Sequence, residues 1–348
     1  MLAALTVLAA LAAVGCGGGG GSPGGTGLTA SVAASGATFP KAFYEEVVAG
    51  YRKTEPGVTM AYAGGGSGKG RQDLADMLVD WAGTDGVVKA EDKPKFKGGE
   101  FVYVPTVAGP IAVVFNLLGV DQLALSPEVI ARIFQREITN WNDPAIAADN
   151  PGVKLPNRAI TVAHRSDGSG TTENFTKFLV AAAAQEWALG SGATVEWPAG
   201  TQAGNGNAGV SQIVKGANGA IGYVDLSDAK AVGLRYASVK NRAGNYVKPS
   251  LESASAALAG AEVRPDLTYN PLWAEGEDSY PITAPTWIIT YKTQADPAKG
   301  RAVTSFLTYL LTEGEALAPL VDYAPLPESL RQKALAQVSA IVVPEQAP

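Results

Sequence analysis

Short apolar runs alternate with helical patterns along the chain from Leu28 onward. The runs are rich in β-branched and aromatic residues, which favours β-strands. Because strands and helices alternate, the sequence predicts an α/β protein with largely parallel sheets. The predicted strands are Val58–Tyr62, Phe101–Val104, Ile111–Phe115, Ile160–Ala163, Ala220–Val224 and Trp287–Tyr291.

Apolar residues at helical spacing predict the helices between these strands. Ser126-Pro127-Glu128 predicts a further helix start, with Ser as N-cap, Pro in the first turn and an acid beside it. The apolar residues that define the other helices are Phe43, Val47, Val48 and Tyr51 in the first, Leu74, Met77, Leu78 and Trp81 after Ser67, and Phe175, Phe178, Leu179 and Ala182 after Thr171.

Loops rich in Gly, Ser and Thr lie at the starts of three predicted helices: Gly36–Pro40, Gly64–Gly70 and Arg165–Thr172. A helix N-terminus exposes unpaired N–H groups and a partial positive charge, so such a loop suits an anion. The same pattern is typical of an ordinary tight turn before a capped helix. The residues alone therefore leave both interpretations open.

The N-terminal segment is typical of export rather than of a folded domain. Met1–Val14 carries no charged side chain and is too short to span a membrane, as expected for a secretory signal. Ala13-Val14-Gly15-Cys16 resembles a bacterial lipobox, in which the Cys is lipidated. Only Gly, Ser, Pro and Thr follow up to Gly27, a composition typical of a flexible tether. We expect a signal peptide over residues 1–15, then a lipidated Cys16 and a tether over residues 16–27.

Composition excludes several classes of function. The 348 residues correspond to roughly two domains, and 46% of them are apolar, enough for a large core. The 27 Lys and Arg form no dense run, and 33 Asp and Glu give a net charge of −6, which excludes a non-specific nucleic-acid binder. One Cys and one His exclude a disulfide framework and the usual zinc sites. A Ser-His-Asp enzyme is disfavoured, because His164 would have to be its base; we expect it to be a packed or hydrogen-bonded neighbour of Arg165.

At the three loops the sequence resembles the phosphate-binding protein of the bacterial high-affinity phosphate ABC transporter. The resemblance extends over nearly the whole chain after the tether. It rests on Gly36-Ala37-Thr38-Phe39-Pro40, the loop at Ser67, Trp81-Ala82-Gly83-Thr84-Asp85, Ile138-Thr139-Asn140-Trp141-Asn142-Asp143, Arg165 to Thr171, Val195-Glu196-Trp197-Pro198 and Gly219-Ala220-Ile221-Gly222-Tyr223-Val224.

The resemblance implies the type II periplasmic binding-protein fold, in which two α/β domains joined by a hinge close on a ligand in the cleft between them. One domain would comprise residues 28–107 and 283–348, and the other residues 108–282. Carried over by position, the implied phosphate ligands of the first domain are Ala37, Thr38, Phe39, Ser67 and Asp85. Those of the second are Arg165, Ser169, Gly170 and Thr171, and Asp167 would orient Arg165.

Asp85 is the unusual member of this set, because a carboxylate normally repels an anion. One interpretation is an Asp at a strand end that caps a turn. The other is a proton acceptor: at neutral pH phosphate still carries a proton, whereas sulfate carries none. Asp85 would accept a hydrogen bond from phosphate and repel sulfate, which would give selectivity.

The sequence and the resemblance together predict a lipid-anchored, extracytoplasmic protein that binds inorganic phosphate and delivers it to a membrane permease. We expect a monomer with no cofactor, no metal and no enzymatic activity. The alternatives are a binding protein for another tetrahedral oxyanion, such as sulfate or molybdate, and a secreted phosphatase. The phosphatase is disfavoured, because the sequence shows no cluster of metal ligands or activated nucleophile.

Overall fold

The computed structural model describes residues 27–345. The predicted signal peptide, Cys16 and nearly all of the predicted tether lie outside these residues. Within the described part of the chain, no helix is long and apolar enough to cross a membrane.

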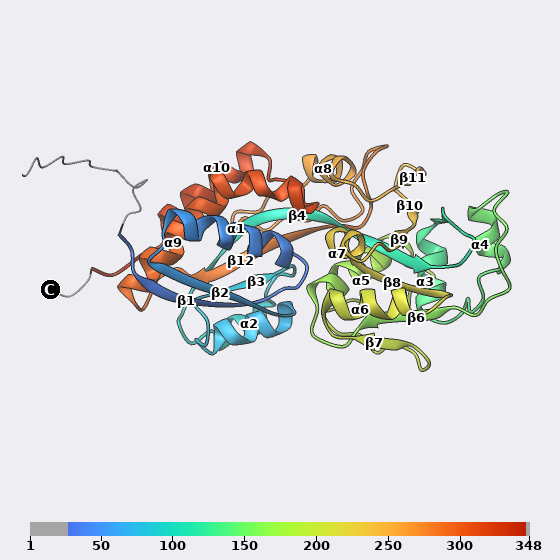
Figure 1. The fold of residues 1–348 in the computed structure, drawn as a ribbon, viewed down its shortest axis with the longest axis horizontal. Helices are drawn as coiled ribbons and strands as arrows, with labels where there is room; N and C mark the ends of the chain where they lie inside the picture. The colour runs from blue at the N-terminus through green and yellow to red at the C-terminus, as the bar shows by residue number, and fades with distance from the viewer. Residues whose placement is uncertain (1–26, 346–348) are drawn as a thin grey trace, which may run out of the picture.

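Nine strands of the described chain form one sheet, which divides into two halves on either side of β4 (Phe101–Asn116) in the order β2-β1-β3-β12-β4-β8-β6-β7, with β9 also paired to β4. The first half and the helices that cover it are called the first lobe, and β8-β6-β7 with their helices the second lobe; Figure 1 shows them side by side. The expected α/β fold with two lobes is therefore confirmed.

In the first lobe, β1 pairs in parallel with β2 and β3, and β12 pairs antiparallel with β3. An aromatic cluster packs behind its loops: the Trp81 ring stacks 5.1 Å from that of Tyr62 and 5.5 Å from that of Phe306. The elements are β1 (Ala30–Gly36), α1 (Lys41–Thr54), β2 (Val58–Gly65), α2 (Ser67–Ala75), β3 (Trp81–Thr84), the 3₁₀ helix η1 (Ala90–Lys95), β12 (Thr283–Tyr291), α9 (Pro297–Leu311), the 3₁₀ helix η2 (Glu313–Val321) and α10 (Glu328–Ser339).

In the second lobe, β6 pairs in parallel with β7 and β8. Three further strands form a small second sheet in the order β11-β10-β5. The elements between β4 and β12 are β5 (Ala124–Leu125), α3 (Pro127–Phe134), α4 (Pro144–Asp149), β6 (Thr161–Arg165), α5 (Gly170–Ala182), β7 (Gln202–Gly204), α6 (Gly206–Gly216), β8 (Ala220–Asp225), α7 (Leu226–Ala231), β9 (Arg235–Tyr236), β10 (Ser238–Lys240), β11 (Tyr246–Val247) and α8 (Leu251–Ala259).

Strand β4 joins the two lobes. Its residues 101–110 pair antiparallel with β12, and residues 111–116 pair antiparallel with β8 on its other edge. The sequence predicted two strands here, separated by Pro105 and Pro110, whereas the structure has one. Proline lacks a backbone donor and is tolerated at irregularities of a sheet. Pro105 pairs with Trp287 beside a register shift, and Pro110 lies where β4 changes partner.

The prediction of largely parallel sheets is therefore only partly correct, since the central pairs are antiparallel and the outer pairs are parallel. The helices beginning after Gly36–Pro40, at Pro127 and at Gly170 are confirmed. The helix after Ser67 starts as predicted, but its continuation to Trp81 is wrong, because α2 ends at Ala75 and Trp81 begins β3.

The end of α2 has an identifiable cause. Met77 takes a left-handed conformation with φ of 59°. Its N–H donates to the carbonyl of Leu74, and the N–H of Leu78 donates to that of Asp73, at 2.9 and 2.8 Å. This is the Schellman arrangement that ends helices. It leaves Met77 and Leu78 exposed, so their apolar spacing does not mark a buried face.

Candidate functional site

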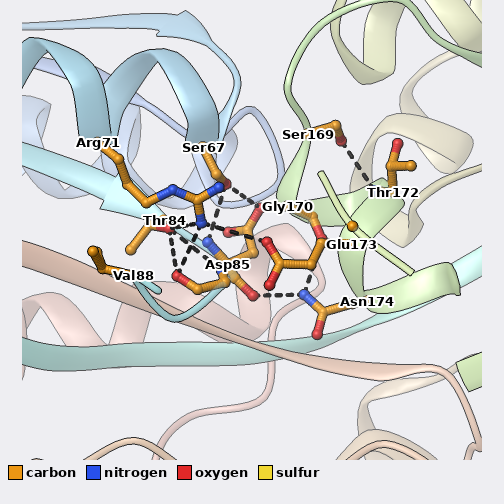
Figure 2. Close-up of polar contacts among 12 residues, drawn as sticks. Ser67, Arg71, Thr84, Asp85, Val88, Ser169, Gly170, Thr172, Glu173 and Asn174 are labelled. Carbon is orange, nitrogen blue, oxygen red and sulfur yellow. Dashed lines mark hydrogen bonds and ion pairs between the residues drawn. The ribbon is translucent and has the colours of Figure 1, made fainter. Parts of the chain in front are cut away.

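The three loops meet between the two lobes. The Gly68 N–H donates to the Gly168 carbonyl at 2.8 Å, which joins the second loop to the third. Across from the first loop, the Asn207 N–H lies 3.4 Å from the Thr38 hydroxyl oxygen. Figure 2 shows Ser67, Asp85 and Gly170 together where the lobes face each other. All three glycine-rich loops lie at helix starts, as the sequence predicted.

The first loop presents backbone donors. The N–H of Ala37 is already bonded to the Gly83 carbonyl at 2.9 Å, so it is not a free donor. Within residues 27–345, the N–H groups of Thr38 and Phe39 donate to no other group of the protein. The Phe39 carbonyl accepts a hydrogen bond from the Tyr323 hydroxyl, which fixes the loop. Thr38 and Phe39 can therefore bind an anion through their backbone, whereas Ala37 shapes the loop.

Asp85 is held between Ser67 and Thr286. The Asp85 N–H donates to the Ser67 Oγ at 3.1 Å, and that hydroxyl donates in turn to Asp85 Oδ2 at 3.3 Å. On the other side, Thr286 Oγ1 donates to Asp85 Oδ1 at 2.7 Å. Burial raises the pKa of Asp85 to about 7, although the Thr286 hydrogen bond, the charges of Arg165 and Arg71 and the Ser67 hydroxyl each lower it. The sequence did not indicate Thr286.

Arg165 ends β6 and is held by side chains on two sides. On one side its Nε donates to Asp167 Oδ1 at 2.8 Å and its Nη2 donates to Asp167 Oδ2. On the other side its Nη1 lies 2.7 Å from Asn207 Oδ1 and 3.4 Å from Thr171 Oγ1. Burial alone would raise the pKa of Asp167, but the hydrogen bond and charge of Arg165 bring it below its ordinary value. The guanidinium is buried and charged, and Asp167 lies where it can orient it.

The N-terminus of α5 completes the group of donors. Ser169 is the N-cap, because its Oγ accepts from the Thr172 N–H at 3.1 Å. Among the described residues, the N–H groups of Gly170 and Thr171 have no protein acceptor. A Cβ on Gly170 would lie 2.3 Å from Ser67 Oγ and 2.6 Å from Asp85 Oδ2, so only glycine fits here. The α5 N-terminus therefore lies directly over Asp85 and Ser67.

A second set of contacts joins the lobes beside the loops. Arg71 of α2 lies 3.4 Å from Glu173 of α5, and both side chains are largely buried. Asn174 Nδ2 donates to the Asp85 carbonyl at 2.6 Å. The only hint of these residues in the sequence is their position. Glu173 and Asn174 come directly after the third loop, and Arg71 comes directly after the second.

Another network supports Arg165 from the opposite side. Asn207, which accepts from Arg165, donates through Nδ2 to Asp225 Oδ2 at 2.7 Å. Tyr323 of the first lobe lies 3.1 Å from Asp225 Oδ1 and donates to the Phe39 carbonyl. These residues come from segments far apart in the sequence, where none of them forms a motif. A cleft of about 470 Å³ opens beside them between the lobes, with Thr38, Lys41, Gly65, Asn207 and Asp228 in its lining.

His164 lies outside the group of donors. Its ring stacks 4.8 Å from that of Trp197, and its Nε2 lies 3.0 Å from Thr201 Oγ1. Burial lowers the pKa of His164, so the ring is neutral at neutral pH. The prediction of a packed, hydrogen-bonded neighbour of Arg165 is confirmed.

The arrangement suits a small tetrahedral anion that carries a proton. Backbone N–H groups and the Arg165 guanidinium can donate to an anion, as can the Ser67 hydroxyl if its proton turns from Asp85 Oδ2 to the ligand, and bonds to charged groups are the stronger hydrogen bonds. Asp85 can accept a proton-bearing oxygen in the same space. Within residues 27–345, no three His, Cys, Asp or Glu side chains are grouped so that they could hold a metal ion.

Comparison with known proteins supports the resemblance seen in the sequence. The model of the PBP superfamily domain matches residues 21–313. The chain is 38% identical to the phosphate-binding protein PstS of Pasteurella multocida, over 88% of this chain and 89% of that protein. It is 37% identical to PstS of Methanocaldococcus jannaschii, over 89% of this chain and 86% of that protein.

Solved structures have the same fold. The high-affinity periplasmic phosphate-binding protein PfluDING, solved with phosphate bound, aligns with a TM-score of 0.74 at 25% identity, over 88% of this chain and 93% of that one. A phosphate-binding protein from Stenotrophomonas maltophilia aligns with a TM-score of 0.69 at 21% identity, over 88% of this chain and 94% of the other. This chain therefore belongs to the PBP superfamily and, within it, to the family of phosphate-binding proteins called PstS.

Proposed function

We propose that this protein binds inorganic phosphate between its two lobes, outside the cytoplasm, and delivers it to the permease of an ABC transporter. The observation that supports this most directly is the position of Asp85: a buried carboxylate lies beside Ser67 and under the α5 N-terminus, in a site otherwise rich in donors. The relatives named PstS support the same ligand.

In this proposal, donors from both lobes surround the phosphate. The first lobe contributes the Thr38 and Phe39 N–H groups and Ser67. The second lobe contributes Arg165 together with the Gly170 and Thr171 N–H groups at the start of α5. Ser169 acts mainly by capping that helix, and Ala37 by shaping the first loop.

Asp85 would select phosphate over sulfate. Ionised Asp85 accepts a hydrogen bond from the hydroxyl of phosphate, whereas sulfate presents only lone pairs to it and is repelled. Because burial raises the pKa of Asp85 to about 7, this selection is strongest above neutral pH. Sulfate and molybdate binding proteins are therefore the alternatives that a test must distinguish.

The hinge of the clamp would lie in the strands that join the lobes. β4 changes its pairing partner between Pro110 and Ile111, and β12 begins at Thr283. We place the domain boundaries near these points, with residues 28–107 and 283–348 in one domain and residues 108–282 in the other. Contacts such as that of Gly68 with Gly168 then exist only when the lobes are closed.

The remaining parts of the proposal concern the setting of the protein. Cys16 would carry the lipid that anchors it to the membrane, with the segment up to Gly27 as a tether. The protein would act as a monomer, would bind its ligand without a cofactor and would not be an enzyme. Its partners would be phosphate, the permease and the membrane.

Paired calorimetric titrations of wild type and Asp85→Asn with phosphate and sulfate at pH 8 test the proposal. Wild type should bind phosphate and reject sulfate. The substitution removes a charge-assisted hydrogen bond to phosphate, so phosphate affinity should fall roughly 10- to 150-fold. Sulfate affinity should rise, because the repulsion is lost. Wild-type protein that binds sulfate or molybdate better than phosphate would overturn the assignment. An unchanged phosphate-to-sulfate ratio in the variant would make Asp85 a structural cap.

A further inference from the structure

Thr286 is the nearest donor to the buried carboxylate of Asp85. It lies on β12, is fully buried, and its hydroxyl donates to Asp85 Oδ1 at 2.7 Å. The same hydroxyl also lies 3.4 Å from the Thr84 carbonyl and within hydrogen-bond reach of the Tyr44 hydroxyl. Thr286 therefore donates to one carboxylate oxygen, Oδ1, while the other, Oδ2, accepts from the Ser67 hydroxyl at 3.3 Å and lies beside Gly170 at the start of α5.

We propose that Thr286 is a positioning residue that determines anion selectivity: its hydrogen bond to Oδ1 favours the ionised carboxylate and turns Oδ2, which already accepts from Ser67, toward the start of α5, where a lone pair can accept a proton-bearing oxygen. This inference rests on the proposed function and adds to it a residue that would act on the ligand only through Asp85.

The surroundings of Asp85 make this one hydrogen bond important. Burial favours the neutral acid, and the Thr286 hydrogen bond is the strongest influence that opposes it. Tyr44 and Tyr62 also face Asp85, but burial raises their pKa values further, so both phenols stay uncharged. The charged groups that act on Asp85 are the cations Arg165 and Arg71, and Glu173 pairs with the second of these.

The protonation state of Asp85 decides which anion fits. Ionised Asp85 accepts from the hydroxyl of phosphate. Protonated Asp85 can instead donate to sulfate, so sulfate binding requires that Asp85 take up a proton. Above the pKa of Asp85, each unit by which that pKa rises therefore makes sulfate binding about tenfold tighter. Phosphate carries its own proton, so its affinity does not increase when the pKa of Asp85 rises.

Thr286→Val tests the inference, because valine has nearly the same shape, suits a strand and lacks the hydroxyl. We expect the pKa of Asp85, measured by carboxyl-carbon NMR in the ligand-free protein, to rise by about one to two units. At pH 8 to 9 the phosphate-to-sulfate affinity ratio, measured by calorimetry, should fall roughly 10- to 100-fold. Thr286→Ser retains the hydroxyl and should restore both values. Thr286→Ala removes the same hydroxyl and replaces valine if valine disturbs the fold.

Thr290→Val is the matched control. Thr290 is also buried on β12, but its hydroxyl donates to the Asp80 carbonyl at 2.9 Å, away from Asp85. Thr290→Val should therefore change neither the pKa of Asp85 nor the phosphate-to-sulfate affinity ratio. An unchanged ratio and an unchanged Asp85 pKa in folded Thr286→Val or Thr286→Ala, or failure of serine to restore them, overturns the role of Thr286. The phosphate titration of wild type tests the proposed function separately, since it involves no substitution.

Discussion

The ion pair between Arg71 and Glu173 predicts a specific effect on ligand release. Arg71 lies on α2 of the first lobe and Glu173 on α5 of the second, 3.4 Å apart. Their side chains are 19% and 11% exposed, so water weakens the pair less than it weakens a surface pair. In the proposed clamp this pair, which joins the lobes, would stabilise only the closed state. Removing it should therefore favour opening.

Glu173→Gln is the preferred perturbation. It also removes the ion pair of Glu173 with Lys177 at 2.6 Å, but that pair lies within α5, whereas the loss of Arg71 would also change the pKa of Asp85. In the variant Arg71 keeps its hydrogen bonds to Thr84 Oγ1 and to the Gly86 carbonyl, each at 3.3 Å. A hydrogen bond to a charged group contributes about 1.5–3 kcal/mol, and the 3.4 Å distance places this one at the lower end. We therefore expect about tenfold weaker phosphate binding, mostly through faster dissociation.

Stopped-flow measurement of phosphate release, with a phosphate-trapping chase, checks this expectation. The control is Glu328→Gln, which removes an exposed pair with Arg331 inside α10 and should leave the rate unchanged. In a double-mutant cycle, Arg71→Met should lower the phosphate affinity less in the Glu173→Gln background than in wild type. A wild-type release rate in stable, folded Glu173→Gln would refute the idea that this pair stabilises closure.

Three further substitutions test other parts of the structure. Gly170→Ala should fold normally but abolish phosphate binding in calorimetry, because its Cβ would meet Ser67 and Asp85 when the lobes close. The control is Gly168→Ala, which should still bind phosphate because its Cβ would be 3.4 Å from the nearest atom. Burial raises the pKa of Glu315 from 4.5 to about 7, although the Leu326 N–H and Arg331 oppose it. Its contribution to stability is therefore complete below pH 4.5 and lost as the pH rises through 7, so Glu315→Gln should raise the Tm at pH 8 more than at pH 5. Cys16→Ser should leave phosphate binding intact and release the protein from membranes on fractionation; continued membrane association would argue against the lipid anchor.

The parts of the site that lie within one loop could be predicted from the sequence. Glycines followed by a helical pattern signal a backbone that turns sharply and then exposes N–H groups, and this information is local. Ser67, Arg165 and Gly170 all belong to such loops. In the structure Gly170 lies against Ser67, and Arg165 contacts Thr171, the residue after Gly170. The fact that all three loops meet there came from the family resemblance, because spacing along the chain does not reveal which loops meet.

The supporting residues could not be predicted in this way. Thr286 and Asp85 are 201 residues apart, and a threonine in an apolar strand is ordinary in sequence. Asn207 and Asp225 become part of the site only because α6 and β8 pack beside β6. The incorrect helix at Met77 has a related cause: the apolar spacing was real, but a left-handed turn ended the helix first.

The position of β12 has a consequence for the order of folding. This strand lies between β3 and β4 in the sheet, yet every element of the second lobe precedes it in the chain. Closing so long a loop costs entropy before the new contacts can offset it, which slows folding. The second lobe consists mainly of one continuous stretch and does not wait for β12, so we expect it to fold first. The hydrogen bond from Thr286 to Asp85 then forms only when β12 joins the sheet, late in folding. The anion site is therefore the last part of the molecule to assemble.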